Sequence, residues 1–289
     1  MKDSVRRYWL EFNNPLEGRV QYMYCDRLGY VSTGVGIKID QTSAPMTAPT
    51  PAQRASSLDL ANQFQWTAPD NSVATAEMVA ADWDSVKSRM DLAAQGHLAY
   101  LDKRNLVLSQ DEIDRAVFAK VDAMEATLKG GYFTDFDDWP ADAQLGLLSM
   151  SWGIGPARFG EYPTFRGYVA AGDWAGASGE CRMLPNEGTI IIRNKRNAQC
   201  FQNAGRVVGE GLDPELLSVD LTSPLGIQVA LAHLGCDPGP TDGGIGPKTT
   251  AAVQLYQSQW QMDQTGNPAD IIAQLNTDLV NDGFNVFTS

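Results

Sequence analysis

Hydrophobic residues recur at helical spacing through much of the middle of the chain. Between about Val73 and Val207, segments such as AEMVAADWDSVKSRMDLAA and DEIDRAVFAKVDAMEATL repeat apolar positions every three or four residues, which is the period of an amphipathic α-helix. Ser109 precedes Asp111 and Glu112 in a pattern typical of a helix start. We therefore predict a helical body over this region.

A different pattern precedes it. Around Gly29 to Ile39 the segment YVSTGVGIKID alternates β-forming residues with glycines, which favours a small hairpin or sheet. The preceding GRVQYMYC is expected to lead from a helix into a strand. Residues 41–57 are rich in proline and small polar residues and predict an extended surface loop or insertion. The expected fold class is α+β and mainly helical.

A third pattern begins after the polar stretch Gly211-Leu212-Asp213-Pro214. Residues 223–276 contain three short helical patterns separated by turns, and Pro247 follows Gly246 where proline is favoured at the first helical position. We predict a small three-helix bundle. The predicted organisation is a first domain at 1–212, a linker at 213–222 and a second domain at 223–289.

Composition and charge exclude some classes of binding partner. The 289 residues suffice for two hydrophobic cores, and 22 basic against 35 acidic residues give a net charge of −13. This charge disfavours nucleic acid and anionic lipid as partners. We see no signal peptide and no apolar run long enough to span a bilayer. We expect synthesis in the cytoplasm, no membrane insertion, and export by another route.

Metal and thiol chemistry have little support. The chain has four cysteines, Cys25, Cys181, Cys200 and Cys236. Their spacing matches no paired metal motif or small disulfide scaffold, so we predict free thiols. His97 and His233 are the only histidines, which leaves little material for a His-rich zinc site or a Ser-His-Asp triad. A hydrolase here would depend on carboxylates, without metal or cofactor.

Glu17 and Asp26 are the candidate carboxylates. Glycoside hydrolysis needs one carboxylic acid to protonate the leaving oxygen and one carboxylate to act on the sugar or on water. Glycines at 29, 34 and 36 allow tight turns and close approach of backbone to a sugar. With 35 acids in the chain, the spacing alone indicates little, and two solvated surface acids are the simpler interpretation.

The register of the neighbouring residues is more specific. The string L-E-G-R-V-x-x-x-Y-x-D-x-x-G-Y-x-S-T-G-V-G resembles the active-site segment of phage-type lysozymes, glycoside hydrolase family 24. The resemblance implies that Glu17 is the general acid and that Asp26 acts with a hydroxyl to position water. Ser32 stands at the family's threonine position, and Thr33 is the alternative. Only one of the two hydroxyls can face the cleft, because neighbouring strand residues point to opposite faces.

Weaker similarity to that family extends over most of residues 10–207. By themselves Arg193, Lys195 and Arg196 are most simply a solvated basic face. The resemblance places Arg193 where the family has an arginine beside the catalytic glutamate. Such a partner would lower the pKa of Glu17 and oppose its acid role. We expect Trp152 and Trp174 to pack in a core rather than bind sugar.

The C-terminal region has a second resemblance. The segment G-x-D-P-G-P-x-D-G-G-I-G-P-K-T-x-x-A-V-x-x-Y-Q resembles the type 1 peptidoglycan-binding domain. Most of its matched residues are turn glycines, caps or core positions, so they indicate the fold more than the binding atoms. The substrate-binding residues therefore stay unassigned.

Together the two resemblances imply a lysozyme-like domain joined to a peptidoglycan-binding bundle. The expected function is a muramidase that cleaves the β-1,4 bond between N-acetylmuramic acid and N-acetylglucosamine with inversion. The alternative is a catalytically inactive wall-binding or structural protein, for instance in a phage tail. The expected setting is the periplasm of a target or host bacterium, reached as a phage endolysin or as an antibacterial effector with an immunity protein. The acidic charge favours the effector.

Overall fold

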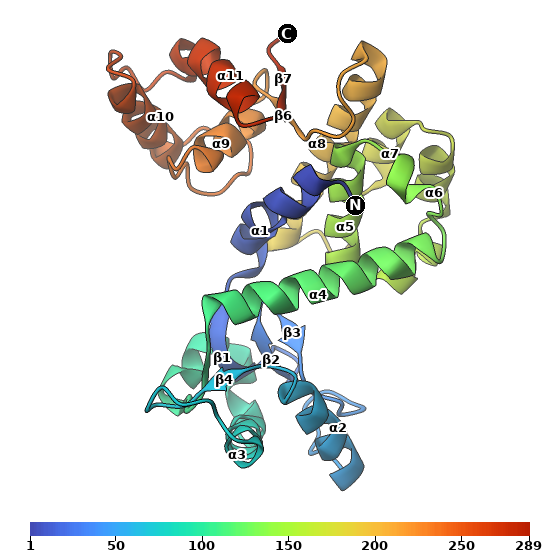
Figure 1. Cartoon of the computed structure of the whole chain (residues 1–289), viewed down its shortest axis with the longest axis vertical. Coiled ribbons are helices and arrows are strands. Elements are labelled where there is room, and N and C mark those ends of the chain that lie inside the picture. The colour runs from blue at the N-terminus through green and yellow to red at the C-terminus, as the bar shows by residue number, and fades with distance from the viewer. The chain divides into compact units, whose positions relative to one another are not determined.

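The computed structural model describes the backbone of residues 1–289 and every side chain except that of residue 103. Helices dominate, and the strands are few and short (Figure 1). The predicted fold class, mainly helical α+β, is confirmed. The chain forms two compact units. We call Glu17–Lys120 the sheet unit, and Met1–Leu16 with Val121–Ser289 the helical unit.

A three-stranded antiparallel sheet lies in the sheet unit. Its strands are β1 (Val20–Cys25), β2 (Val31–Gly34) and β3 (Ile37–Lys38), in the order β1-β2-β3. Tyr24 pairs with Ser32, and Ser32 pairs with Lys38. The predicted hairpin is confirmed, and so is the passage from a helix, α1 (Asp3–Glu17), into a strand.

The predicted loop at 41–57 is wrong from residue 51 onward, where helix α2 (Pro51–Ala61) begins. The side chain of Thr50 accepts a hydrogen bond from the Gln53 amide at 3.3 Å, and the Gln53 side chain accepts one from the Thr50 amide at 3.0 Å. Pro51 occupies the first turn, where its missing N–H costs nothing. The segment contains a helix start as well as a linker-like composition.

Short helices and a second small sheet complete this unit. In chain order they are β4 (Trp66–Thr67), α3 (Ala76–Lys87), η1 (Met90–Gln95), η2 (His97–Lys103), β5 (Val107–Leu108) and α4 (Gln110–Lys129). β4 and β5 pair antiparallel. Ser109 Oγ accepts a hydrogen bond from the Glu112 amide at 3.0 Å, which confirms the predicted helix start of α4.

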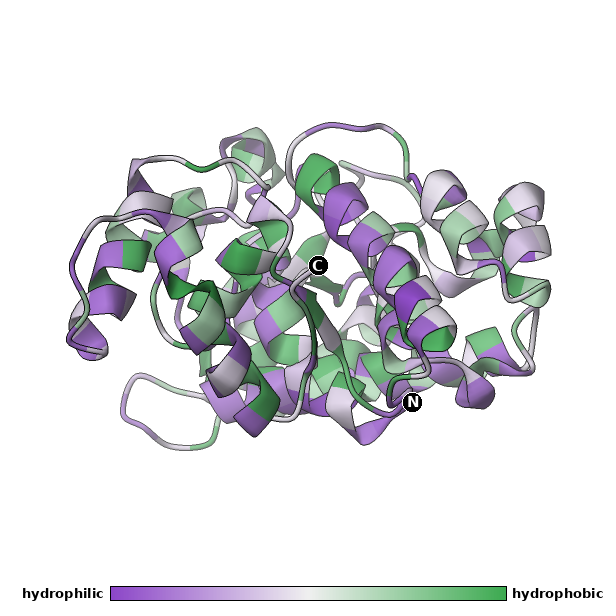
Figure 2. Cartoon of the chain, turned by 90° about the horizontal axis from the view of Figure 1, so that it is seen from above, coloured by the Kyte–Doolittle hydropathy of each residue, from purple (hydrophilic) through white to green (hydrophobic). Residues whose placement is uncertain are grey.

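The helical unit centres on a buried helix, α5. Its helices after α4 are η3 (Phe136–Asp138), α5 (Ala141–Ile154), η4 (Pro156–Glu161), α6 (Pro163–Ala170), α7 (Trp174–Glu180) and α8 (Thr189–Glu210). Residues 141–152 are all buried. Trp152 and Trp174 are 7% and 6% exposed, so both pack in the core as expected. Several other helices carry hydrophobic and hydrophilic residues side by side (Figure 2), as amphipathic helices do.

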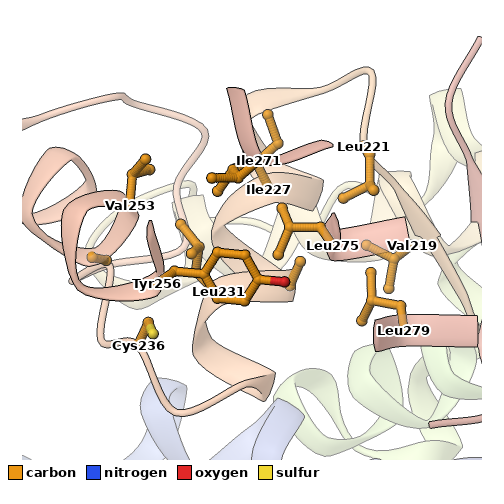
Figure 3. Packing of buried hydrophobic residues seen from close by; sticks show 12 residues of the cluster. Val219, Leu221, Ile227, Leu231, Cys236, Val253, Tyr256, Ile271, Leu275 and Leu279 are labelled. Carbon is orange, nitrogen blue, oxygen red and sulfur yellow. The ribbon is translucent and has the colours of Figure 1, made fainter. Parts of the chain in front are cut away.

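The C-terminal residues form the predicted three-helix bundle. Its elements are β6 (Ser218–Asp220), α9 (Pro224–His233), α10 (Pro247–Gln259), η5 (Pro268–Ile271), α11 (Ile272–Asn281) and β7 (Asn285–Phe287). Leu231, Tyr256 and Leu275 lie in one hydrophobic cluster between the helices (Figure 3). β6 and β7 add a parallel strand pair that the helical pattern did not predict.

The predicted linker 213–222 contains β6, which is tied to the helical body. Ser218 Oγ donates to Asp142 Oδ2 at 2.7 Å, and Asn203 Nδ2 donates to the Ser218 carbonyl at 2.9 Å. Burial raises the pKa of Asp142 to about 7. The domain boundary itself stays a prediction. Among the described residues, no helix is long and apolar enough to cross a membrane.

Candidate functional site

Glu17 is the last residue of α1 and is half-buried. Gly18 follows with φ +73°, a left-handed conformation that ends the helix and that glycine adopts at little cost. Glu17 Oε2 lies 3.8 Å from the point where a side chain on Gly36 would begin, and Gly36 has φ +73°. The carboxylate therefore lies beside the turn that joins β2 to β3.

Asp26 follows β1 and organises the next turn. Its Oδ1 accepts hydrogen bonds from the amides of Leu28 at 2.9 Å and Tyr30 at 3.0 Å. The Asp26 amide donates to the Tyr30 carbonyl at 2.8 Å, and Gly29 supplies φ +90°. Because the turn holds Oδ1, the orientation of the whole carboxylate is set before any ligand binds.

Tyr24 connects the two carboxylates. Burial raises the pKa of Tyr24 to about 12, and the charges of Asp26 and Glu17 add to the shift. Tyr24 lies on β1, two residues before Asp26, and is half-buried. Glu17 precedes β1 and Asp26 follows it, both within the sheet unit, and their pairing as catalytic carboxylates stays a prediction.

Ser32 and Thr33 have different surroundings. Ser32 is 2% exposed and lies directly opposite Tyr24, so the two side chains share one face of the sheet. Thr33 Oγ1 donates to the Tyr22 carbonyl at 3.2 Å and the residue is fully buried. The hydroxyl of Thr33 thus has a backbone partner, whereas Ser32 is on the face that carries Tyr24.

Arg193 lies in α8 and is 1% exposed. Its Nη1 donates to Asn13 Oδ1 and to Ser149 Oγ, each at 3.1 Å. Arg193 belongs to the helical unit and Glu17 to the sheet unit. The supporting role that the resemblance implies for Arg193 stays a prediction.

The interpretation of Arg193, Lys195 and Arg196 as a solvated face is wrong for both arginines. Arg196 is 4% exposed, donates to the Phe12 carbonyl at 2.9 Å and lies 3.9 Å above the Phe12 ring. Positions 193 and 196, three apart, share the buried face of α8 with Cys200. That helical spacing was a readable signal of burial. Lys195 alone of the three is exposed.

Polar side chains within the C-terminal bundle fasten its loops. Gln228 Oε1 accepts from the Gly243 amide and Gln228 Nε2 donates to the Gly244 carbonyl, both at 2.8 Å. Thr249 Oγ1 donates to the Pro238 carbonyl at 3.1 Å. These contacts explain why a long loop between two helices keeps one conformation. They are structural contacts and identify no ligand atoms.

All four cysteines are free and buried, which confirms the predicted thiols. Burial raises the pKa of Cys25 to about 11 and that of Cys181 to about 12, so neither is a ready nucleophile. Within the described part of the chain, no group of three or more His, Cys, Asp or Glu side chains is arranged to hold a metal ion.

Residues 226–268 match the family described as "Putative peptidoglycan binding domain". The matched residues span most of α9, all of α10 and the start of η5. The chain therefore carries a peptidoglycan-binding domain of type 1, which supports peptidoglycan as a partner. No curated protein matches the chain. The family match covers residues 226–268 only, and the resemblance of the N-terminal segment to phage-type lysozymes stays a prediction.

Proposed function

We propose that the protein is a muramidase that cleaves the β-1,4 bond between N-acetylmuramic acid and N-acetylglucosamine in peptidoglycan. One observation carries the proposal: a chain with a peptidoglycan-binding domain also holds Glu17 and Asp26 before and after one strand of a small sheet, in the register of a lysozyme motif. A glycan hydrolase needs such a carboxylate pair, and the binding domain supplies the polymer.

Each residue has a role in this proposal. Glu17 protonates the glycosidic oxygen as the bond to the anomeric carbon breaks. Asp26, held through Oδ1, removes a proton from water through Oδ2 while that water attacks the anomeric carbon from the opposite face. Ser32 holds the water by a hydrogen bond. Attack on the opposite face inverts the anomeric configuration.

The test uses the full chain with insoluble peptidoglycan. We expect wild-type protein to release reducing ends, and mass spectrometry to find hydrolysed rather than anhydro sugars. Glu17→Gln and Asp26→Asn should each lower the rate by about 10²–10⁴-fold, because each removes one proton-transfer group. Asp59→Asn, which changes an exposed acid of α2, is the control and should keep wild-type activity.

Ser32→Ala and Thr33→Val separate the two hydroxyls. We expect Ser32→Ala to lower the rate. Thr33→Val should lower stability, because the hydrogen bond from Thr33 to the Tyr22 carbonyl disappears. If wild-type protein sediments with cell walls but releases no sugar, the muramidase proposal fails and the inactive wall-binding alternative stands.

We propose the periplasm of a rival bacterium as the site of action, with an immunity protein as a further partner. The net charge of −13 favours an antibacterial effector over a phage endolysin, since many endolysins are basic. Expression directed to the periplasm should kill the host, and co-expression of a neighbouring gene should protect it. If the protein kills the host and no neighbouring gene protects it, the effector proposal fails and the phage endolysin is the remaining interpretation.

A further inference from the structure

Two tyrosines of β1 and one histidine of η2 form an aromatic cluster in the sheet unit. The His97 ring lies 6.3 Å from the Tyr22 ring and 5.9 Å from the Tyr24 ring, centroid to centroid. The Tyr22 hydroxyl lies 3.1 Å from His97 Nδ1 and 3.3 Å from the His97 carbonyl oxygen. Both polar positions on that side of His97 therefore face one phenol, which orients the ring.

His97 is held in place while it remains exposed to solvent. Gly96, with φ +81°, lets the chain turn directly into η2. The next residue, Leu98, is 68% exposed. An imidazole oriented at Nδ1 presents Nε2 to solvent, and within residues 1–102 and 104–289 no hydrogen bond to His97 Nε2 is found. The oriented His97 ring, its Nε2 atom and the apolar Leu98 side chain therefore lie together at the surface.

This cluster adjoins the candidate carboxylates. The Tyr24 ring packs against the His97 ring in an edge-on arrangement, and Tyr24 pairs with Ser32 across the sheet. The charges of Asp26 and Glu17 contribute to the raised pKa of Tyr24. His97, Tyr24 and the two acids all belong to the sheet unit, and Tyr24 lies on β1 two residues before Asp26.

We propose that Tyr24, His97 and Leu98 form a glycan subsite that binds an N-acetylated sugar next to the bond to be cleaved. This inference rests on the proposed muramidase function. Aromatic rings pack against the C–H face of a sugar, and a ring nitrogen hydrogen-bonds to a hydroxyl or acetamide group. Leu98 offers an apolar contact to the acetyl methyl. A few polar groups among apolar ones are typical of ligand sites.

The chemistry of the subsite fits a neutral sugar better than the anionic stem peptide. The chain carries a net charge of −13, and the Asp26 carboxylate adds local negative charge that repels carboxylates. Recognition by stacking and by uncharged hydrogen bonds avoids that repulsion.

The test compares His97→Ala and Leu98→Ala in the full chain. Each should raise KM for peptidoglycan by about tenfold while kcat stays within about twofold, because uniform binding is lost and the chemistry is untouched. His97→Gln keeps a hydrogen-bonding side chain and should recover part of the affinity. Val73→Ala, at a position 63% exposed in the same unit, is the control and should leave KM unchanged.

A second measurement separates this inference from the proposed function. Calorimetry with triacetylchitotriose, using the Glu17→Gln protein, should show binding that His97→Ala weakens about tenfold. Cleavage by wild type with unchanged KM in both subsite variants would overturn the subsite alone. Chitotriose binding that depends on His97, without cleavage by wild type, would overturn the muramidase alone. Absence of both binding and cleavage would overturn both.

Discussion

Asp40 and Lys87 form an ion pair that is almost completely excluded from solvent. Lys87 Nζ lies 2.9 Å from Asp40 Oδ2 and also donates to the Gly29 carbonyl at 2.9 Å. Asp40 is 0% and Lys87 is 4% exposed. Asp40 Oδ2 further accepts from the Val31 amide at 3.0 Å. The pair therefore ties the turn after Asp26 to β2 and to α3.

Removing one partner of this pair should be costly. We expect Asp40→Asn to lower the free energy of unfolding by about 3–5 kcal/mol, because the Lys87 ammonium would stay buried without a counter-charge. Chemical denaturation of the full chain measures the change. Asp84→Asn, which breaks a half-exposed pair with Arg54, should have little effect. Equal effects of the two substitutions would contradict this account.

The same pair predicts acid sensitivity. Burial by itself would raise the pKa of Asp40, but hydrogen bonds from Thr42, Lys87 and the Val31 amide outweigh it and lower the pKa. A carboxyl whose folded pKa lies below its unfolded value of 3.8 stabilises the fold above that value. The contribution is lost as pH falls through the lowered pKa, and Asp40→Asn should lack this dependence.

At the scale of elements, α9 of the C-terminal bundle contacts α1 through His233. His233 Nδ1 lies 3.0 Å from Glu11 Oε2, and its Nε2 lies 3.4 Å from Asp282 Oδ2. Tyr8 and Phe284 pack around the ring. These groups, with Arg7, line a cavity of about 370 Å³. His233 thus joins one helix of the body to two parts of the bundle.

This contact should weaken as pH rises. The hydrogen bond to Glu11 raises the pKa of His233 above 6.5, against the effect of burial, and Asp282 adds to the rise. The stabilisation is fully present below pH 6.5 and is lost as pH rises through the raised folded pKa. We expect wild-type Tm to fall over that range relative to His233→Gln. Parallel Tm curves for the two proteins would contradict the assignment.

At the scale of the whole molecule, the net charge of −13 sets how the protein meets the anionic cell wall. Long-range repulsion opposes binding, while the peptidoglycan-binding domain supplies short-range contacts. Added salt screens the repulsion, with a Debye length near 8 Å at about 0.15 M. We expect sedimentation with purified cell walls to stay constant or improve from about 0.02 to 0.15 M salt. A steep loss of sedimentation as salt increases would indicate binding through a basic surface and would contradict this prediction.

Much of the architecture could be predicted because it depends on local chemistry. Helical periodicity predicted the body and the three-helix bundle, and glycines with β-forming residues predicted the hairpin. Gly246-Pro247 and Ser109 marked helix starts that the structure contains. Residues 51–57 are helical despite a loop-like composition, because Thr50 and Gln53 form a capping box at the start of α2. Short-range signals of this kind need no knowledge of tertiary contacts.

The sequence by itself determined the element types, the peptidoglycan-binding domain and the motif that holds Glu17 and Asp26. Only the tertiary structure decided which polar residues are buried and what they bond. Arg193, Arg196 and the Asp40–Lys87 pair lie inside, and His97 meets Tyr22 across 75 positions of sequence. The reason is physical: a side chain's partners across the fold depend on how separate elements pack, and local propensity carries no record of that packing.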